Sequence, residues 1–404
     1  MLSTEINERL TQVGKGTPAG EMLRRYWHPV ATASDLTEEK RAKSVQVLGE
    51  ELVVYRDLSG EYACLADHCA HRGCSLYYGF IEENGIRCAY HGWKYDNQGR
   101  CVEQPFEPKD STYKERIVQQ SYPIERLGGL LWIYMGPQPA PLLPRWDVLV
   151  RDDGAHSLQV HSVLNCNWLQ PQENSLDTVH TQYLHGIMLR SKGLTGGEYY
   201  LRPIVDYGFE LCEWGINKWR EFGGDKPERE IGHPAVFPNI LRQPSGPGHA
   251  MHWRVPIDDT HTQIFWAGFL PDQEVGDSVE NPPVKFLPPY LDENGEHQLT
   301  TFTSQDKMAW ETAGPLFDRS QEHLGSSDRG IAMWRKLMLE QIEIVARGED
   351  PMCVIRDPEK NKMITFEVST GKAAEEYVKL RRDGWAGFYD DPPEDKPSGV
   401  TTKR

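Results

Sequence analysis

Short runs of alternating apolar and polar positions characterise the first third of the chain. Residues 45–56 form two β-branched runs around Gly49-Glu50, a pattern that predicts a hairpin. The segments that follow stay short and are separated by glycines, and residues 130–134 are typical of a closing buried strand. This pattern predicts a small all-β domain over residues 41–136.

A proline-rich segment, residues 137–145, cannot continue a strand or a helix and predicts a linker. Beyond it, strand-like patterns such as residues 251–257 are grouped together. Helical patterns occur near residues 168–185, 305–312 and 329–347. Because strands and helices do not alternate along the chain, the pattern indicates an α+β fold. We expect residues 146–388 to form a larger domain with helices on an antiparallel sheet.

The two ends of the chain are polar. We expect residues 1–40 to be an N-terminal segment that packs on the larger domain, and residues 389–404 to be a disordered tail. The first residues do not resemble a signal sequence, and no run approaches the roughly 18 apolar residues of a membrane-spanning helix. The sequence therefore predicts a soluble, cytoplasmic protein without a membrane partner.

Composition excludes two further classes of protein. With 38% hydrophobic residues and 12 Trp, the chain can bury a substantial core, so general disorder is excluded. The 44 Lys and Arg residues against 60 Asp and Glu residues give a net charge of −16, which would repel a phosphate backbone. A nucleic-acid partner is therefore not expected.

Two short loops each combine a cysteine with a histidine. Cys69 and His71 lie in the first loop and Cys88 and His91 in the second, and a glycine follows each histidine closely. Mixed loops of this kind present one sulfur and one nitrogen apiece to a metal centre. Structural zinc is the alternative, but a zinc finger usually pairs its cysteines in one segment and its histidines in another. The mixed order favours a Rieske [2Fe-2S] cluster, in which one iron takes both cysteines and the other both histidines.

A second candidate metal site lies within residues 165–185. Asp177 and His180 are three apart, so a helix would place them on one face. His180 and His185 are five apart, about 140° round an ideal helix. These histidines can bind one metal only if the helix bulges or ends between them, a distortion that often marks functional sites. Taken alone, two histidines on an amphipathic helix are more often structural than ligands.

Both segments carry a family resemblance. The loops match the Cys-x-His-Arg-Gly and Cys-x-Tyr-His-Gly-Trp patterns of Rieske proteins, with Ala70 and Ala89 where many members have proline. The Asp-x2-His-x4-His pattern of residues 177–185 is similar to the mononuclear iron motif of Rieske non-haem iron oxygenases. The chain resembles the phthalate dioxygenase-like group of that family. Within this group, residues 103–107 and 252–256 look most like those of oxygenases that demethylate 5,5'-dehydrodivanillate.

The resemblance implies two metal centres. The expected ligands of the [2Fe-2S] cluster are Cys69, His71, Cys88 and His91. The expected ligands of a mononuclear Fe(II) are His180, His185 and Asp306, with Asn174 close to them. Candidates for the carboxylate other than Asp306 are Glu311, Asp318 and Asp328. Asp177 has another role in the resemblance: this aspartate bridges a Rieske histidine of a neighbouring subunit, here His91, to an iron-bound histidine, here His180.

The resemblance also implies a reaction. We expect the oxygenase component of a multicomponent monooxygenase that uses O2 on an aromatic acid. The first expectation is O-demethylation of a lignin-derived methoxylated aromatic, which gives a phenol and formaldehyde. Aromatic ring hydroxylation or dihydroxylation is the alternative reaction, and a non-catalytic Rieske electron-transfer protein is the alternative class.

Partners and substrate contacts follow from the same resemblance. No Gly-x-Gly-x-x-Gly segment follows a predicted strand, so electrons are expected from a separate ferredoxin, a separate NAD(P)H-dependent reductase, or both. A homotrimer with electron transfer from cluster to iron between subunits is implied as well. His252 and Arg254 share one face of a predicted strand. They either line a pocket that binds a substrate carboxylate or form a satisfied pair within the sheet.

Overall fold

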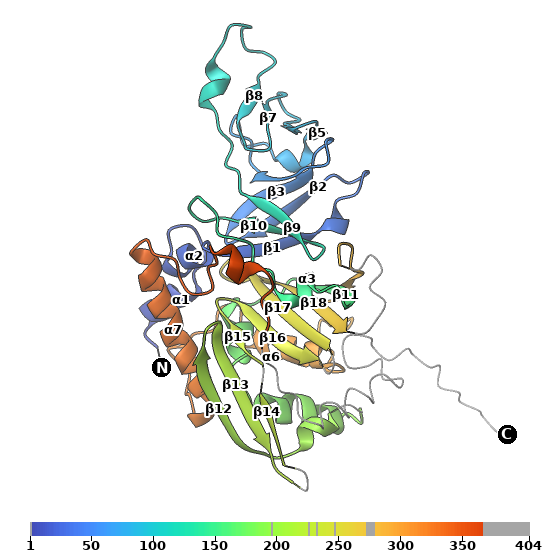
Figure 1. Cartoon of the computed structure of the whole chain (residues 1–404), viewed down its shortest axis with the longest axis vertical. Helices are drawn as coiled ribbons and strands as arrows, with labels where there is room; N and C mark the ends of the chain where they lie inside the picture. The colour runs from blue at the N-terminus through green and yellow to red at the C-terminus, as the bar shows by residue number, and fades with distance from the viewer. Residues whose placement is uncertain are drawn as a thin grey trace, which may run out of the picture.

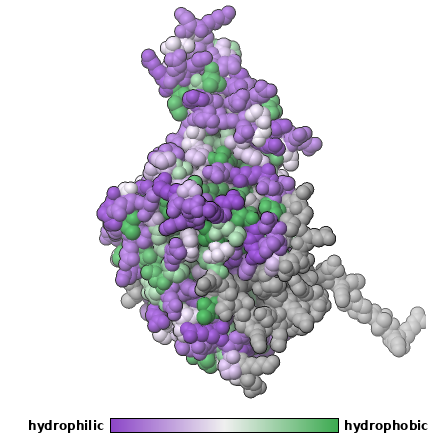
Figure 2. All heavy atoms as spheres, in the orientation of Figure 1, coloured by the Kyte–Doolittle hydropathy of each residue, from purple (hydrophilic) through white to green (hydrophobic). Residues whose placement is uncertain are grey.

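The computed structural model shows two lobes stacked along the long axis of the molecule (Figure 1). It describes residues 2–366 except 195–196, 225–226, 232, 246–247 and 272–278. The predicted tail, residues 389–404, and the last part of the predicted larger domain, residues 367–388, lie outside the described residues. On the face seen in Figure 2, polar residues cover most of both lobes, and apolar residues form small separated groups.

The small lobe consists of short antiparallel strands. One sheet contains β2 (Ala42–Val47), β3 (Glu50–Arg56) and β4 (Tyr62–Ala66), and another contains β5 (Phe80–Glu82), β6 (Gly85–Arg87), β7 (Lys94–Tyr95) and β8 (Cys101–Glu103). The predicted hairpin is β2–β3, but its turn is Leu48-Gly49 rather than Gly49-Glu50. Both turn residues have positive φ, 51° and 77°, which matches the twist of the two strands.

A third sheet lies between the lobes (Figure 1). It has the order β1 (Trp27–Thr32), β10 (Leu130–Tyr134), β9 (Ile124–Leu127), and all five residues of β10 are buried, in line with their apolar run. Because β1 pairs with β10, the predicted boundary at residue 41 separates two paired strands. The N-terminal helices α1 (Thr4–Thr11) and α2 (Pro18–Leu23) lie beside the long helix α7 (Arg329–Ala346) of the large lobe.

A large sheet forms the centre of the second lobe. Its order is β12-β13-β15-β16-β17-β18-β11-β19, with β14 paired to β13, and all described pairs are antiparallel except β11 with β19. The bounds are β11 (Gly154–His161), β12 (Ile204–Cys212), β13 (Gly215–Phe222), β14 (Glu228–Ile231), β15 (Ala235–Val236), β16 (Ile240–Ser245), β17 (Gly248–Pro256), β18 (Thr262–Pro271) and β19 (Val284–Leu287). Grouped antiparallel strands with helices around them agree with the predicted α+β arrangement.

Helices pack around this sheet. The remaining α-helices are α3 (Asp147–Val150), α4 (Leu169–Asn174), α5 (Met188–Ser191) and α6 (Phe302–Thr312), and η4 (Thr181–Ile187) is a π-helix. The helix predicted near residues 168–185 is therefore broken between α4 and η4. The short 3-10 turns are Ala33–Asp35, Leu76–Tyr78, Tyr113–Arg116, Glu198–Leu201, Ser326–Asp328 and Pro358–Asn361. Within the described part of the chain, no helix has the length and apolar character needed to cross a membrane.

One hydrophobic core joins the two lobes. Trp132 of β10 and Trp253 of β17 pack edge to face with their ring centroids 5.2 Å apart, and each is 1% exposed. Such pairs stabilise a contact beyond the area that they bury. The proline-rich segment 137–145 has no helix or strand, yet it is packed: the backbone N–H of Leu142 donates to Ile355 O, and Asn361 donates to Leu143 O. The lobes are therefore held in a defined arrangement.

A buried ionic network fixes the end of α4, where the second metal motif begins. The Glu173 carboxylate accepts from Arg319 Nη2 at 2.7 Å and from Arg335 Nε of α7 at 2.6 Å. Arg335 also donates to Glu322. Burial raises the pKa of Glu173, but the two guanidinium groups outweigh this and hold it below its ordinary value. The network joins three chain segments that are distant in sequence.

We predict that Glu173→Gln lowers the free energy of unfolding by about 3–5 kcal/mol, because it leaves buried guanidinium charge without its counter-charge. Denaturant unfolding followed by tryptophan fluorescence measures this change. Glu343→Gln is the matched control, since its ion pair with Arg9 is exposed and should contribute no more than about 1 kcal/mol. Equal losses in the two variants would contradict the prediction.

Candidate metal centres

The two cysteine–histidine loops have the same backbone design. In the first, the N–H of Cys69 donates to Cys74 O and that of Gly73 to Cys69 O. In the second, the N–H of Cys88 donates to Trp93 O and that of Gly92 to Cys88 O. Gly73 and Gly92 have φ of 71° and 73°, a conformation that favours glycine, so each turn requires the glycine of its motif. Two equivalent turns thus present the four predicted side chains.

The four side chains converge with the sulfurs inside and the imidazoles outside. Cys69 and Cys88 are 3% and 2% exposed, whereas His71 and His91 are only partly buried, with their ring centroids 4.6 Å apart. Burial raises the pKa of the Cys69 thiol, a hydrogen bond with Tyr95 at 3.1 Å opposes this, and the neighbouring Cys88 raises it further. Two adjacent buried thiolates need positive charge between them, so this donor set fits a Rieske cluster.

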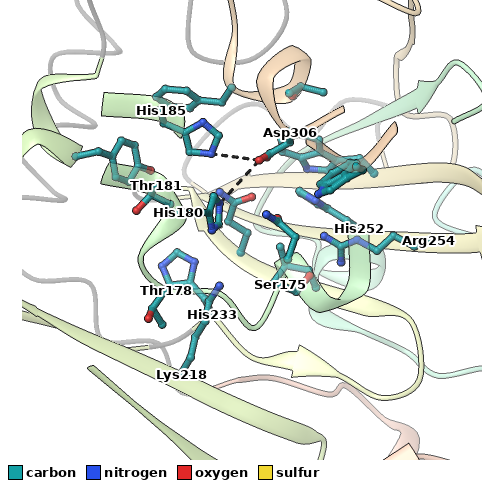
Figure 3. A pocket seen from close by; sticks show the side chains of 18 of the residues that line it. Ser175, Thr178, His180, Thr181, His185, Lys218, His233, His252, Arg254 and Asp306 are labelled. Atoms are coloured by element: carbon teal, nitrogen blue, oxygen red, sulfur yellow. Dashed lines mark ion pairs between the residues drawn. The ribbon is translucent and has the colours of Figure 1, made fainter. Parts of the chain in front are cut away.

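The second predicted set also comes together. Ligand atoms of His180, His185 and Asp306 all lie within 4.8 Å of one another. Asp306 Oδ1, from α6, is 3.4 Å from His185 Nε2 and 3.8 Å from His180 Nε2 (Figure 3). This oxygen is buried and has no hydrogen-bond partner among the described residues. An unpartnered carboxylate oxygen facing two imidazole nitrogens fits an absent cation, and two histidines with one carboxylate are the ligands of non-haem Fe(II).

The π-helix explains how histidines five apart meet. His180 immediately precedes η4 and His185 lies within it, and a π-helix closes its turns with i to i+5 hydrogen bonds. The wider turn brings two residues five apart to nearly the same side, where their ring centroids are 5.3 Å apart. The distortion that the spacing requires is therefore present.

Neighbouring groups orient the two imidazoles. His185 Nδ1 is 2.9 Å from Gln305 Oε1, which accepts its proton and leaves Nε2 free to bind a metal. Asp177 Oδ1 accepts from the backbone N–H groups of Val179 and His180, and Oδ2 lies 3.6 Å from His180 Nδ1. Asn174 lines the same cavity from the end of α4.

The electrostatics of the two carboxylates are similar. Burial raises the pKa of Asp177, but the imidazole of His180 and the two backbone N–H groups hold it well below its ordinary value. Burial also raises the pKa of Asp306, and the imidazoles of His185 and His180 outweigh that effect and lower it. Both groups are therefore carboxylates at neutral pH, as an acceptor and a metal ligand must be.

The alternative carboxylates have other partners. Glu311 Oε1 accepts from the backbone N–H of Asn165 at 2.8 Å. Asp318 accepts from Ser320 N, and Asp328 from Gly325 N. The described carboxylate that meets both histidines is Asp306.

The triad opens into a cavity that encloses about 950 Å³ of space free of protein atoms, open solvent at its mouth included. Aromatic walls come from Tyr200, Trp266 and Phe302. Basic side chains reach it from two strands. Lys218 of β13 and His252 and Arg254 of β17 are labelled in Figure 3, and Arg220 of β13 lines the cavity as well. The strand pattern predicted a role for His252 and Arg254, whereas Lys218, Arg220 and Gln305 resemble ordinary strand or helix residues in the sequence.

Within the part of the chain that the structure describes, two of these basic groups have no carboxylate partner. Arg254 is 2% exposed, its Nε has no hydrogen-bond partner, and its Nη1 reaches only Gln172 Oε1 at 3.4 Å. Lys218 donates to the carbonyl oxygen of Asp177, also at 3.4 Å. Burial lowers the pKa of Arg254 to about 9 and that of Lys218 to about 7. Basic groups without counter-ions in a cavity favour an anionic ligand, and the charge of that ligand would in turn favour their protonated forms.

Comparisons with known proteins agree with this architecture. The family model "Rieske [2Fe-2S] domain" matches residues 26–123, and "LigXa C-terminal domain like" matches residues 293–381. The 5,5'-dehydrodivanillate O-demethylase oxygenase subunit of Sphingobium sp. is 41% identical over 394 residues, which cover 93% of this chain and 90% of that protein. The phthalate 4,5-dioxygenase oxygenase subunit of Pseudomonas putida is 29% identical over a region that covers 92% of this chain and 93% of that protein. The class is thus an iron oxygenase with a Rieske domain.

The chain belongs to the Rieske non-haem iron oxygenases, as an oxygenase subunit. Among solved structures, the terminal oxygenase of carbazole 1,9a-dioxygenase from Nocardioides aromaticivorans IC177 has a TM-score of 0.60 at 20% identity, covering 83% of this chain and 96% of that one. This likeness confirms the predicted fold. The family uses a Rieske cluster, a mononuclear iron and O2, so the zinc site and the non-catalytic electron carrier are set aside.

We predict that Asp306→Ala loses the mononuclear iron, because an open site with three protein ligands then keeps only two. The visible absorption and the acid-labile sulfide of the Rieske cluster should stay unchanged. Iron and sulfide analysis per chain measures both. Glu311→Gln is the control and should retain all of its iron; retention by Asp306→Ala together with loss by Glu311→Gln would move the role to Glu311.

Proposed function

We propose that this chain is the oxygenase component of a monooxygenase that O-demethylates a methoxylated aromatic acid of the 5,5'-dehydrodivanillate type. The observation that carries the proposal is a triad of two histidines and a carboxylate that opens into an aromatic cavity. Two basic side chains of this cavity, Lys218 and Arg254, have no carboxylate partner among the described residues. The 41% identical relative named for this reaction supports the choice of substrate class.

In this proposal Cys69, His71, Cys88 and His91 hold the Rieske cluster, and His180, His185 and Asp306 hold the iron. When bound, the iron activates O2 and the cluster stores an electron for the reaction. Gln305 keeps His185 in the tautomer whose Nε2 is a ligand. Asp177 stabilises the orientation of His180 and is the proposed link for electrons arriving from a cluster.

The cavity residues orient the substrate. Arg254 binds a carboxylate of the aromatic acid, and Lys218, on another side of His180 in Figure 3, can bind a second anionic group. Among the described residues, the carboxylate of Asp306 favours the charged form of Arg254, and a metal ion bound to Asp306 would reduce that effect. An acid substrate restores the balance of charge and fixes which carbon faces the triad.

The reaction consumes one O2, two electrons and two protons for each methoxy group. Hydroxylation of the methyl carbon gives a hemiacetal. The bond between the aryl oxygen and the former methyl carbon then breaks, which leaves a phenol and formaldehyde. The second oxygen atom of O2 leaves as water. If a ring carbon faced the triad instead, the product would be a hydroxylated ring. Because one relative is named as a phthalate 4,5-dioxygenase oxygenase subunit, ring hydroxylation is the second candidate reaction.

Electron donors and assembly belong to the same proposal. We propose a separate ferredoxin and NAD(P)H-dependent reductase as donors; the solved carbazole 1,9a-dioxygenase includes a complex between oxygenase and ferredoxin. The two candidate centres lie in different lobes of one chain (Figure 1). A homotrimer that sets the cluster of one subunit against the iron of the next would shorten that path.

The decisive experiment is to incubate the enzyme, reconstituted with both metal centres, with ferredoxin, reductase, NAD(P)H and 5,5'-dehydrodivanillate. We expect formaldehyde in proportion to O2 consumed, together with the demethylated phenol. Asp306→Ala serves as the control for formaldehyde from other sources. Consumption of O2 with a ring-hydroxylated product and no formaldehyde would replace O-demethylation by ring hydroxylation.

We further predict that Arg254→Gln weakens binding of the acid by roughly ten- to a hundredfold, the usual worth of hydrogen bonds to a charged group. Anaerobic calorimetry with the acid and with its neutral amide analogue measures this difference. The amide should bind the variant and the wild type nearly alike. An equal loss for acid and amide would show that Arg254 shapes the cavity without recognising the carboxylate.

A further inference from the structure

Strand β13 contacts the segment that carries the first iron-binding histidine. Arg220 Nη1 donates to the carbonyl oxygen of Thr178 at 3.2 Å and to Thr181 Oγ1 at 2.7 Å. These two acceptors lie on either side of His180 in the sequence, where α4 has ended and η4 is about to begin. One guanidinium group therefore donates hydrogen bonds to residues before and after His180, a proposed iron ligand.

The guanidinium is itself held in place. Arg220 Nε donates to Glu230 Oε2 of β14 at 2.5 Å, and Glu230 Oε1 is 3.0 Å from His233 Nε2. The guanidinium carbon lies 5.4 Å from the ring centre of Tyr200 and 5.0 Å from that of Phe222. Arg220 and Glu230 are 8% and 7% exposed. Two of its nitrogens are thus engaged in hydrogen bonds, and two aromatic rings pack against the guanidinium group.

Stability alone does not account for this arrangement. Replacing a buried ion pair with apolar residues of similar volume is often neutral or stabilising, because two charges lose their hydration on burial. Besides the ion pair with Glu230, Arg220 donates to Thr178 and Thr181, which belong to the segment that carries His180. A guanidinium group that is itself held in place can donate in several directions at once. Such a group can keep His180 in one position at the start of the π-helix.

We propose that Arg220, held by Glu230 and His233, is a positioning residue that fixes His180 for metal binding at the π-helical turn. This inference rests on the proposed iron triad. Lysine keeps the charge but has a single donor nitrogen, so it cannot reproduce the branched contacts. Loss of the hydrogen bonds from Arg220 to Thr178 and Thr181 should therefore lower metal affinity even where charge and fold are retained.

The test uses full-length enzyme with its Rieske cluster intact and its mononuclear site emptied. Fe(II) and, separately, Co(II) are titrated anaerobically into wild type and Arg220→Lys, and the ligand-field absorption of Co(II) is recorded. We expect the variant to bind both ions at least about tenfold more weakly, as for other residues that orient metal ligands. The Co(II) bands should shift, and the absorption of the cluster should not.

Arg242→Lys is the matched control. Arg242 is fully buried and forms a two-bonded ion pair with Asp147, but it does not contact the iron-bearing segment. Its variant should lose stability as Arg220→Lys does and keep wild-type metal affinity. Thr181→Val removes one contact and no charge, so it should weaken metal binding less, and its effect should not add to that of Arg220→Lys.

The outcomes separate the two claims. If wild type binds metal at the triad and both Arg220→Lys and Thr181→Val bind it equally well, the positioning role is wrong while the iron site stands. If wild type binds no metal there, the proposed site and this inference fall together. If Arg220→Lys does not fold, Thr181→Val alone decides: wild-type affinity and wild-type Co(II) bands in that variant overturn the inference.

Discussion

The geometry of one helical turn governs the catalytic lobe. Histidines five residues apart diverge on an α-helix and converge only where the helix widens, so the proposed iron site requires the π-helix η4. That turn is not self-sufficient. Asp177 accepts from the backbone N–H of His180 just before the turn, Arg220 of β13 donates to Thr181 at its start, and Gln305 orients the imidazole of His185. The surrounding sheet and helices can be understood as the support that keeps an unfavourable local geometry in one place.

Support of this kind must be rigid, and the packing provides rigidity at both ends of the segment. Before it, Glu173 at the end of α4 is bound to Arg319 and Arg335, which ties the segment to α7. After it, His185 lies against α6 through Gln305 and Asp306. Because buried ionic networks tolerate little displacement of their members, a shift at either end would separate the ligands. The proposed iron site thus depends on tertiary packing more than on its own sequence motif.

This dependence explains which features the sequence could predict. The Rieske loops are local: each ligand pair spans a few residues, and β6–β7 pairing brings the second loop into a tight turn, so Cys69, His71, Cys88 and His91 were identifiable from their pattern. The spacing of His180 and His185 predicted a distortion without predicting its form. Asp306 was reached only through family resemblance, since nothing near it in the sequence marks it. Lys218, Arg220 and Gln305 were missed because their roles come from partners that only the folded chain brings near.

Strand β13 contributes to both proposed roles of the cavity, which are to bind the substrate and to hold His180 in position. Lys218 and Arg220 are two residues apart on one strand, so they share a face, and both point to the segment from Asp177 to Thr181. Among the described residues, Lys218 donates to the carbonyl oxygen of Asp177. The same side chain lines the cavity in which we propose that the substrate binds. If a carboxylate binds to Lys218, the strand that holds it also carries Arg220, which contacts the backbone beside His180. In the proposed function, β13 thus connects substrate recognition with the position of His180 through two side chains on one face.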